Sequence, residues 1–341
     1  MVTLVAVNSP GFTDGNWQQY FELRKSLNQR YASPLKLNSW RTLRQQALSG
    51  FESFPAYYHA VLKEEGRLVG WVDFFVRSAE TPEAMAFPRM EALFDRIPRR
   101  VSNALAGWLV PLLDSHGLDR LYCMVWREAW SEVARSWGGH QFARCDEYVL
   151  RFSEAPRDLI QRWRKQGAEA NPDLTLSFYD QIPQNRIDEY LALMQIGLED
   201  MPEEEESGAS NEWHREELEG YLKWLKDNHM VQFHVFLIDS EGGLVGLSDV
   251  SVDLDNPSRA DQFMTAVARS HRGRRLANWM KAAMFEHLEQ EVEGVESMRT
   301  IMRTINEPIQ HLNEQMGFKI GRQGREFRVP REGLLKAVNS G

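Results

Sequence analysis

A run of basic side chains stands at a junction between an apolar segment and a helical pattern. The stretch "TAVARSHRGRRLANWMK", residues 265–281, carries five of them: Arg269, His271, Arg272, Arg274 and Arg275. A strand ending at Val267 would feed a loop and then a helix, whose first N–H groups and dipole favour an anion. Gly273 lets the main chain approach a ligand closely, and arginines donate charge-assisted hydrogen bonds to phosphate. The junction therefore predicts a site for a diphosphate.

Other interpretations of this basic run are a solvated helix start and a nucleic-acid site. The chain has a formal net charge of −9 and a pI of about 5.6, which argues against general affinity for nucleic acid or an anionic membrane. The run is neither a Walker A loop, which needs Lys-Ser/Thr, nor a dinucleotide fingerprint, which needs further glycines. We expect no nucleic-acid partner and no membrane partner.

Two segments share the pattern of a β-hairpin. Residues 58–74 read "YHAVLKEEGRLVGWVDF" and residues 233–250 read "FHVFLIDSEGGLVGLSDV", each with apolar alternation around a short polar turn. Leu68, Val69, Gly70 and Asp73 recur as Leu244, Val245, Gly246 and Asp249. The segments around both hairpins follow the same order, β-α-α-β-β-β-α-β-α-β. The repeat predicts an α/β (α+β) chain made of two similar domains, each a mixed central sheet flanked by helices.

The repeat gives the bounds of the domains, and composition indicates their cellular environment. The predicted domains cover residues 1–153 and 173–341, joined by a linker at 154–172 that holds a short helix. The chain has two cysteines, Cys123 and Cys145, which favours a reducing cytoplasm. No apolar window reaches the length of about 18 residues that a membrane span needs, and the histidines and cysteines have no metal-site spacing.

The basic junction resembles the acyl-CoA-binding motif of the GCN5-related N-acetyltransferases (GNAT family). In that motif a strand ends in Val, and Arg-Gly-x-Gly-x-Gly/Ala opens a helix. The matching residues are Arg272, Gly273, Arg274, Leu276 and Ala277, whereas Arg275 replaces the middle glycine. "TINEPIQHLNEQMGF", residues 304–318, is similar to the second signature of the family, through Asn306, Asn313, Gly317 and Phe318. The resemblance covers residues 173–330, extends more weakly over 1–152, and indicates a tandem-domain GNAT protein.

This resemblance implies an acyl-CoA-dependent N-acetyltransferase that moves acetyl from acetyl-CoA, as co-substrate, to a primary amine of a small molecule or peptide. The implied cofactor contacts are Val267, Arg269, Arg272, Gly273, Arg274, Arg275, Leu276, Ala277, Asn306 and Asn313. It also implies that the strand at 262–267 is splayed from its neighbour. The Val267 N–H would then polarise the thioester carbonyl.

Proton transfer is less defined by the sequence. Asp261, six residues before Val267, is the preferred general base, although "LDNPSRADQ" also fits a turn. Asp249 is matched by Asp73, which favours a shared structural role. Where many family members have a tyrosine acid, this chain has Asn313, so a non-catalytic acyl-CoA-binding protein stays open as the alternative.

The N-terminal half departs further from the family pattern. Its "ALFDRIPRRVSNALAGW" has Arg99 and Arg100 without a glycine beside them, so we expect a degenerate domain. The acidic run at Glu203–Glu206 would attract a cationic amine, or else is a solvated loop. We expect a monomer or a homodimer.

Overall fold

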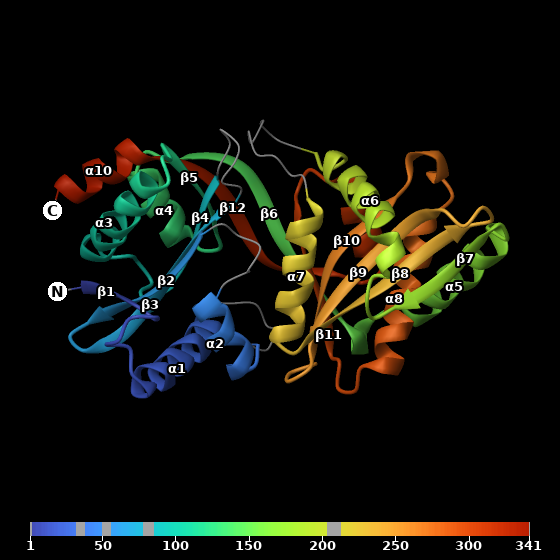
Figure 1. Cartoon of the computed structure of the whole chain (residues 1–341), viewed down its shortest axis with the longest axis horizontal. Coiled ribbons are helices and arrows are strands. Elements are labelled where there is room, and N and C mark those ends of the chain that lie inside the picture. Colours follow the sequence, from blue (N-terminus) through green and yellow to red (C-terminus); the bar gives the residue numbers. More distant parts are fainter. Residues whose placement is uncertain (1, 32–37, 50–55, 78–84, 203–212, 341) are drawn as a thin grey trace. The chain divides into compact units, whose positions relative to one another are not determined.

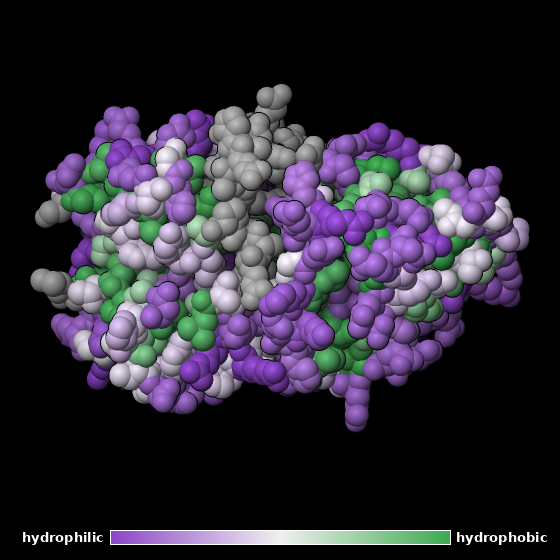
Figure 2. Space-filling view, in the orientation of Figure 1, coloured by the Kyte–Doolittle hydropathy of each residue, from purple (hydrophilic) through white to green (hydrophobic). Residues whose placement is uncertain are grey.

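A computed structural model describes residues 2–31, 38–49, 56–77, 85–202 and 213–340 of the chain (Figure 1). The acidic run predicted near the acceptor lies outside these residues. Polar and charged side chains dominate the visible surface, with apolar patches between them (Figure 2). Over the described residues, none of the helices combines the length and the apolar run required to cross a bilayer.

The described chain forms two compact units, and neither is one continuous stretch of sequence. Counting described residues alone, unit 1 takes residues 2–146 and 322–340, and unit 2 takes residues 147–202 and 213–321. Two long strands, β6 (His140–Arg151) and β12 (Lys319–Pro330), have residues in both units. Each unit has helices packed on a β-sheet, as the repeat predicted.

Unit 1 begins with a four-stranded antiparallel sheet in the order β1-β2-β3-β4. Its elements are β1 (Val2–Ala6), α1 (Asp14–Tyr31), α2 (Trp40–Ser49), β2 (Ala56–Glu64), β3 (Arg67–Arg77), β4 (Met85–Ala92), α3 (Arg99–Ser115), β5 (Arg120–Val125), α4 (Glu128–Ser136) and α10 (Arg331–Asn339). The end of β12 pairs antiparallel with β5, from Arg325 opposite Val125 to Pro330 opposite Arg120. Phe327 and Val329 of β12 are fully buried in the core of this unit.

Unit 2 has its strands in the order β6-β11-β10-β9-β8-β7. Its other elements are α5 (Arg157–Ala170), β7 (Leu174–Tyr179), α6 (Ile187–Glu199), α7 (Arg215–Asp227), β8 (Met230–Asp239), β9 (Leu244–Asp253), β10 (Arg259–Val267), α8 (Leu276–Glu291), β11 (Ser297–Arg303) and α9 (Glu307–Gln315). Successive strand residues point to opposite faces. Val235 and Leu237 of β8 therefore pack with α8 in one core, and Phe236 packs with α6 in the other.

The predicted domain boundaries differ from these units in three places. Residues 147–153, expected in the first domain, belong to unit 2. Residues 157–170 of the expected linker form α5, which packs against α8 within unit 2. Residues 322–340, expected in the second domain, belong to unit 1. The alternation of apolar residues identifies a strand, but it does not say which neighbour that strand pairs with.

Matching buried groups support the duplication of the two hairpins. In unit 2, His234 Nδ1 lies 2.8 Å from Asp249 Oδ1, and Tyr190 Oη donates to Asp249 Oδ2 at 2.7 Å. In unit 1, His59 and Asp73 are likewise buried and lie opposite each other on β2 and β3. Asp249 thus has a structural role, because both of its carboxylate oxygens are occupied.

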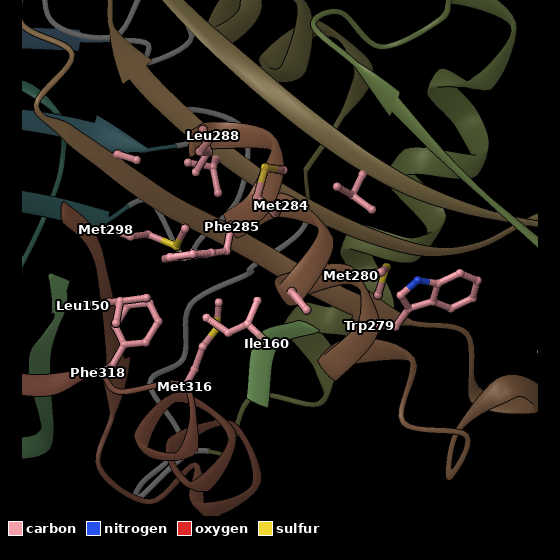
Figure 3. Close-up of a cluster of buried hydrophobic side chains, with 14 of the residues drawn as sticks. Leu150, Ile160, Trp279, Met280, Met284, Phe285, Leu288, Met298, Met316 and Phe318 are labelled. Carbon is pink, nitrogen blue, oxygen red and sulfur yellow. The ribbon is translucent and has the colours of Figure 1, made fainter. Parts of the chain in front are cut away.

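Helix α8 is the centre of the larger core of unit 2. Figure 3 shows Met284, Phe285 and Leu288 of α8 grouped with Met298 of β11, and Trp279 near the start of the helix. Helix α5 approaches Trp279 so closely that a Cβ at Gly167 would lie 2.3 Å from Trp279 Cγ. Only glycine fits that position without movement of one helix.

The contact between α5 and α8 gives a stability prediction. Gly167→Ala should lower the free energy of unfolding by about 1–3 kcal/mol, because the added methyl overpacks the interface. Gly107→Ala is the matched control in helix α3, where Gly107 is exposed and a Cβ meets its nearest neighbour, Val338 Cγ2, at 4.0 Å. It should raise stability by about 0.5–1 kcal/mol. Urea unfolding measures both changes, and equal effects would contradict the packing argument.

Candidate functional site

Strands β10 and β11 run side by side for a short distance and then part. Their parallel register joins Arg259 to Ser297, Ala260 to Met298 and Asp261 to Arg299, and it ends there. Strand β10 continues along β9 as far as Val267, with a bulge between Gln262 and Thr265. A cavity of about 730 Å³ opens beyond the last pair, lined by residues 262–267 of β10 and 300–303 of β11. The splayed strand predicted from the sequence is therefore present.

The backbone of Val267 faces the parted side of β10. The Ala268 N–H donates to Val245 O at 2.9 Å, so residues 268 and 245 form a hydrogen-bonded pair. Such pairs alternate with non-hydrogen-bonded pairs along antiparallel strands. Val267, opposite Gly246, therefore directs its N–H away from β9 and toward the side of β11. Because Val267 also lines the cavity, this N–H is available to an oxygen atom held there.

The loop before α8 forms a cradle for an anion. Gly273 has φ +77° and Arg275 has φ +56°, so two nearly adjacent residues are left-handed. Arg275 is the N-cap of α8 and makes no side-chain capping hydrogen bond to the helix. The first N–H groups of the helix are thus left for a ligand, together with the positive end of the dipole. Arg275 stands where the family motif has glycine, the residue that adopts a positive φ most easily.

The arginines of the junction divide into two groups. Arg272 and Arg275 line the cavity, and Arg272 also pairs with Asp200. Arg269 instead pairs with Glu199 at 2.7 Å. Arg274 Nη2 lies 2.5 Å from Asp173 Oδ1, and Arg274 lines a separate hollow beside α5, which Arg275 also borders. Arg275 has no ion pair with any described residue.

The cavity brings together seven of the predicted residues. They are Val267, Arg272, Gly273, Arg275, Leu276, Ala277 and Asn306. Asn306 is the N-cap of α9 without a side-chain capping bond, so its amide is not used by that helix. Arg269, Arg274, Asp261 and Asn313 do not line the cavity. Arg269 and Arg274 instead pair with acidic side chains 70 and 101 residues away in the sequence.

Asp261, predicted as a general base, lies at the point where β10 and β11 separate. Its carboxylate is 2.9 Å from Arg259 Nη2 and 2.7 Å from Arg299 Nε, and Arg299 also pairs with Glu147 at 3.4 Å. Burial alone would raise the pKa of Asp261, but the two guanidinium groups outweigh it and hold the pKa below its ordinary value. A carboxylate held this way is a poor proton acceptor. It closes the apex of the parted strands.

Lys281 is a cavity residue that the sequence analysis did not identify. It lies on α8, is 3% exposed, and lines the cavity from within the core. Its Nζ donates to Gln262 Oε1 at 2.7 Å and to Asn313 Oδ1 at 2.8 Å. Burial lowers its pKa to about 7. The predicted contact residue Asn313 is thus completely buried behind Lys281. A signal was present, because Lys281 interrupts the apolar run "WMKAAMF".

Comparisons with known proteins place this geometry in context. Residues 195–318 match the family model described as acetyltransferase (GNAT) family. No curated protein sequence matches the chain at a significant level. The fold is similar to that of a tandem GNAT protein from the clavulanic acid biosynthesis pathway, with a TM-score of 0.75, 17% identity, and coverage of 97% of this chain and 98% of that one.

Two further solved structures share the fold. A GCN5-related N-acetyltransferase from Sphaerobacter thermophilus has a TM-score of 0.58 and 10% identity, and the match covers 96% of each chain. A glucosamine N-acetyltransferase region of a fungal multi-domain beta-N-acetylglucosaminidase has a TM-score of 0.64 and 12% identity, over 96% of this chain and 38% of that longer one. At these identities the likeness establishes the fold.

The apex ion pairs give a prediction about Asp261. Asp261→Asn should lower the free energy of unfolding by about 2–4 kcal/mol, because Arg259 and Arg299 lose a shared partly buried carboxylate. The stabilisation by Asp261 is complete above its unfolded pKa of about 3.9 and is lost as the pH falls through the lowered folded pKa. Urea unfolding at neutral pH measures the effect. Asp227→Asn, which removes an exposed pair with Lys223, is the control and should change little.

Burial of Lys281 predicts a pH dependence of stability. The unfolded side chain has a pKa of about 10.4, so between about pH 7 and that value the unfolded chain binds more protons and stability rises with pH. The unfolding free energy of wild type minus that of Lys281→Met should therefore rise by on the order of 2–3 kcal/mol from about pH 7 to 9.5. Exposed Lys165→Met is the control. Parallel pH curves for wild type and Lys281→Met would rule out a buried, depressed lysine.

Proposed function

We propose that the chain transfers acetyl from acetyl-CoA to a primary amine, because residues 195–318 match the acetyltransferase (GNAT) family model and the fold is similar to that of a tandem GNAT protein. The site is the cavity between β10, β11 and the start of α8. The observation that carries the proposal is the Val267 N–H, which faces this cavity a few residues from the anion cradle. One ligand that combines a diphosphate with a thioester suits both features.

The cradle supports binding of the diphosphate of CoA. The backbone at Gly273 and Arg275 is left-handed, and the first N–H groups of α8 have no side-chain cap. Arg272 and Arg275 add positive charge at the same end of the cavity. Arg269 and Arg274 do not line the cavity, so we assign the cofactor to Val267, Arg272, Gly273 and Arg275, with the neighbouring Leu276, Ala277 and Asn306.

The parted strands support the chemistry of acyl transfer. The Val267 N–H can donate to the thioester oxygen, whose negative charge grows as the acceptor nitrogen attacks. The attacking amine must be neutral, which for an alkyl ammonium at pH 7 costs about 4–5 kcal/mol. Asp200, the one carboxylate among the described residues that line the cavity, is paired with Arg272. We therefore assign removal of the amine proton to water in the cavity and not to Asp261.

The N-terminal half is proposed to lack a CoA site of its own. Helix α3 starts after Pro98, and none of the residues at its start has a positive φ. Arg100 Nε lies 2.5 Å from Glu64 Oε1, and Arg99 donates to Ser340 O at 2.7 Å. The two cations that match the junction of unit 2 are thus already used. Both cysteines are buried and form no disulfide with each other, which suits a cytoplasmic protein.

A second candidate function is acyl-CoA binding without transfer. The observation in its favour is Asn313, which occupies the position of an acid side chain in the family and is completely buried. The two functions differ in one result, the release of free thiol from acetyl-CoA when an amine is supplied. The proposed enzyme releases thiol with at least one amine, and the binding protein releases none.

Calorimetric titration with acetyl-CoA tests the site. Wild type should bind one molecule per chain, and Gly273→Glu should weaken binding at least about tenfold, since a carboxylate side chain would repel the diphosphate at the cradle. Gly294→Glu is the matched control, because Gly294 also has a positive φ of 82° and open space around it, and it does not line the cavity. The control should bind acetyl-CoA as wild type does.

The stoichiometry separates the remaining possibilities. Two molecules per chain would show that unit 1 binds CoA as well and would contradict its degenerate assignment. No binding by the wild type would refute the acetyltransferase proposal. With one site established, a screen of small amines and peptides by thiol release identifies the acceptor.

A further inference from the structure

The polar environment of Lys281 is built from neutral amides. Gln262 is held in place because its Nε2 donates to Ser248 Oγ and to Thr265 Oγ1, each at 3.1 Å, which leaves Oε1 directed at Lys281. Asn313 Nδ2 lies 3.6 Å from Met302 Sδ and leaves Oδ1 for Lys281. Two fixed acceptor oxygens therefore position one amine at the wall of the cavity.

Among the described residues, no carboxylate forms an ion pair with Lys281. The charged groups on the adjoining strands are engaged with each other, since Asp261 of β10 pairs with Arg299 of β11 at 2.7 Å. The shift of the Lys281 pKa to about 7 has one cause, burial, with no contribution from a charged neighbour. Near neutral pH the amine can thus both hold and lose a proton.

The hydrogen-bond count leaves one position for a ligand. An ammonium has three N–H donors, and Gln262 and Asn313 accept two of them. The third has no hydrogen-bond acceptor among the described residues, although Nζ also lies 5.6 Å from the centre of the Phe318 ring. After loss of that proton, the two remaining N–H groups keep the same two acceptors, and the lone pair takes the third position. The ammonium and the neutral amine of Lys281 therefore fit the same two acceptors. A group that gives up and regains a proton in each cycle needs such an arrangement.

We propose that Lys281 donates the proton taken up by the sulfur of CoA when acetyl leaves it. This inference rests on the proposed function, which lays the thioester between the parted strands that Lys281 adjoins. When the C–N bond has formed, the C–S bond breaks and its electron pair stays on sulfur. The third N–H of Lys281 gives its proton to that sulfur. The Lys281 side chain is then a neutral amine, and CoA leaves as a thiol. Water then returns a proton to Lys281 before the next cycle.

The test observes the reverse proton transfer, in which Lys281 accepts a proton from the thiol of bound CoA. Thiolate absorbance in the ultraviolet is followed against pH for CoA bound to the protein, with the S-methyl thioether of CoA as the blank. In wild type the bound thiol should titrate at least about one pH unit below the value of about 8.5 for a free thiol. In Lys281→Met it should return to about that value or higher. Exposed Lys165→Met should behave as wild type.

Calorimetry with CoA accompanies each titration, so that two kinds of failure can be told apart. If wild type and Lys281→Met both bind CoA and their thiols titrate alike, the role of Lys281 is overturned and the proposed function stands. If wild type binds no CoA, the proposed function itself fails. If Lys281→Met does not fold, nitrogen NMR of lysine amines in wild type decides. The amine that titrates near pH 7 should shift with CoA and not with the thioether, and equal shifts would overturn the proposal.

Discussion

The architecture of the site depends on the ion pair that ends the pairing of β10 and β11. Asp261 and Arg299 form the last residue pair of the two strands, and their side chains meet at 2.7 Å. Arg259 and Glu147 extend this pair into a chain of alternating charges. Beyond it the backbone of β10 keeps only one neighbour, so Val267 can offer its N–H to the cavity. A sheet paired along its full length would have left no exposed main chain there.

Helix α8 serves the site with both its start and its buried side. Its first turn carries the uncapped N–H groups beside Gly273, and its apolar side chains fill the larger core of unit 2. The same burial that anchors the helix places Lys281 out of water and depresses its pKa. The packing of α8 therefore both anchors the proposed anion site and lowers the pKa of the Lys281 amine.

Local patterns predicted the elements well, and long-range pairing escaped them. The Leu-Val-Gly repeat and the turn residues identified both hairpins, and the tandem GNAT fold is confirmed. The motif also led to Gly273 and Val267, because backbone conformation there follows from residue type and position. The partners of Arg274 and Asp261 could not be read in the same way, since Asp173 and Arg299 reach them through the tertiary fold. Lys281 was overlooked because a lysine is ordinarily exposed.

The last strand of the chain has a consequence for the order in which the protein is made. Phe327 and Val329 of β12 complete the core of unit 1, whose first strand begins at Val2. A ribosome releases the N-terminal residues first, yet their core stays incomplete until residues 327–329 have emerged. The described residues of unit 2 are 147–202 and 213–321, and all of them emerge sooner. The half synthesised first is thus the half that finishes folding last, and it is the one exposed longest to proteases and chaperones.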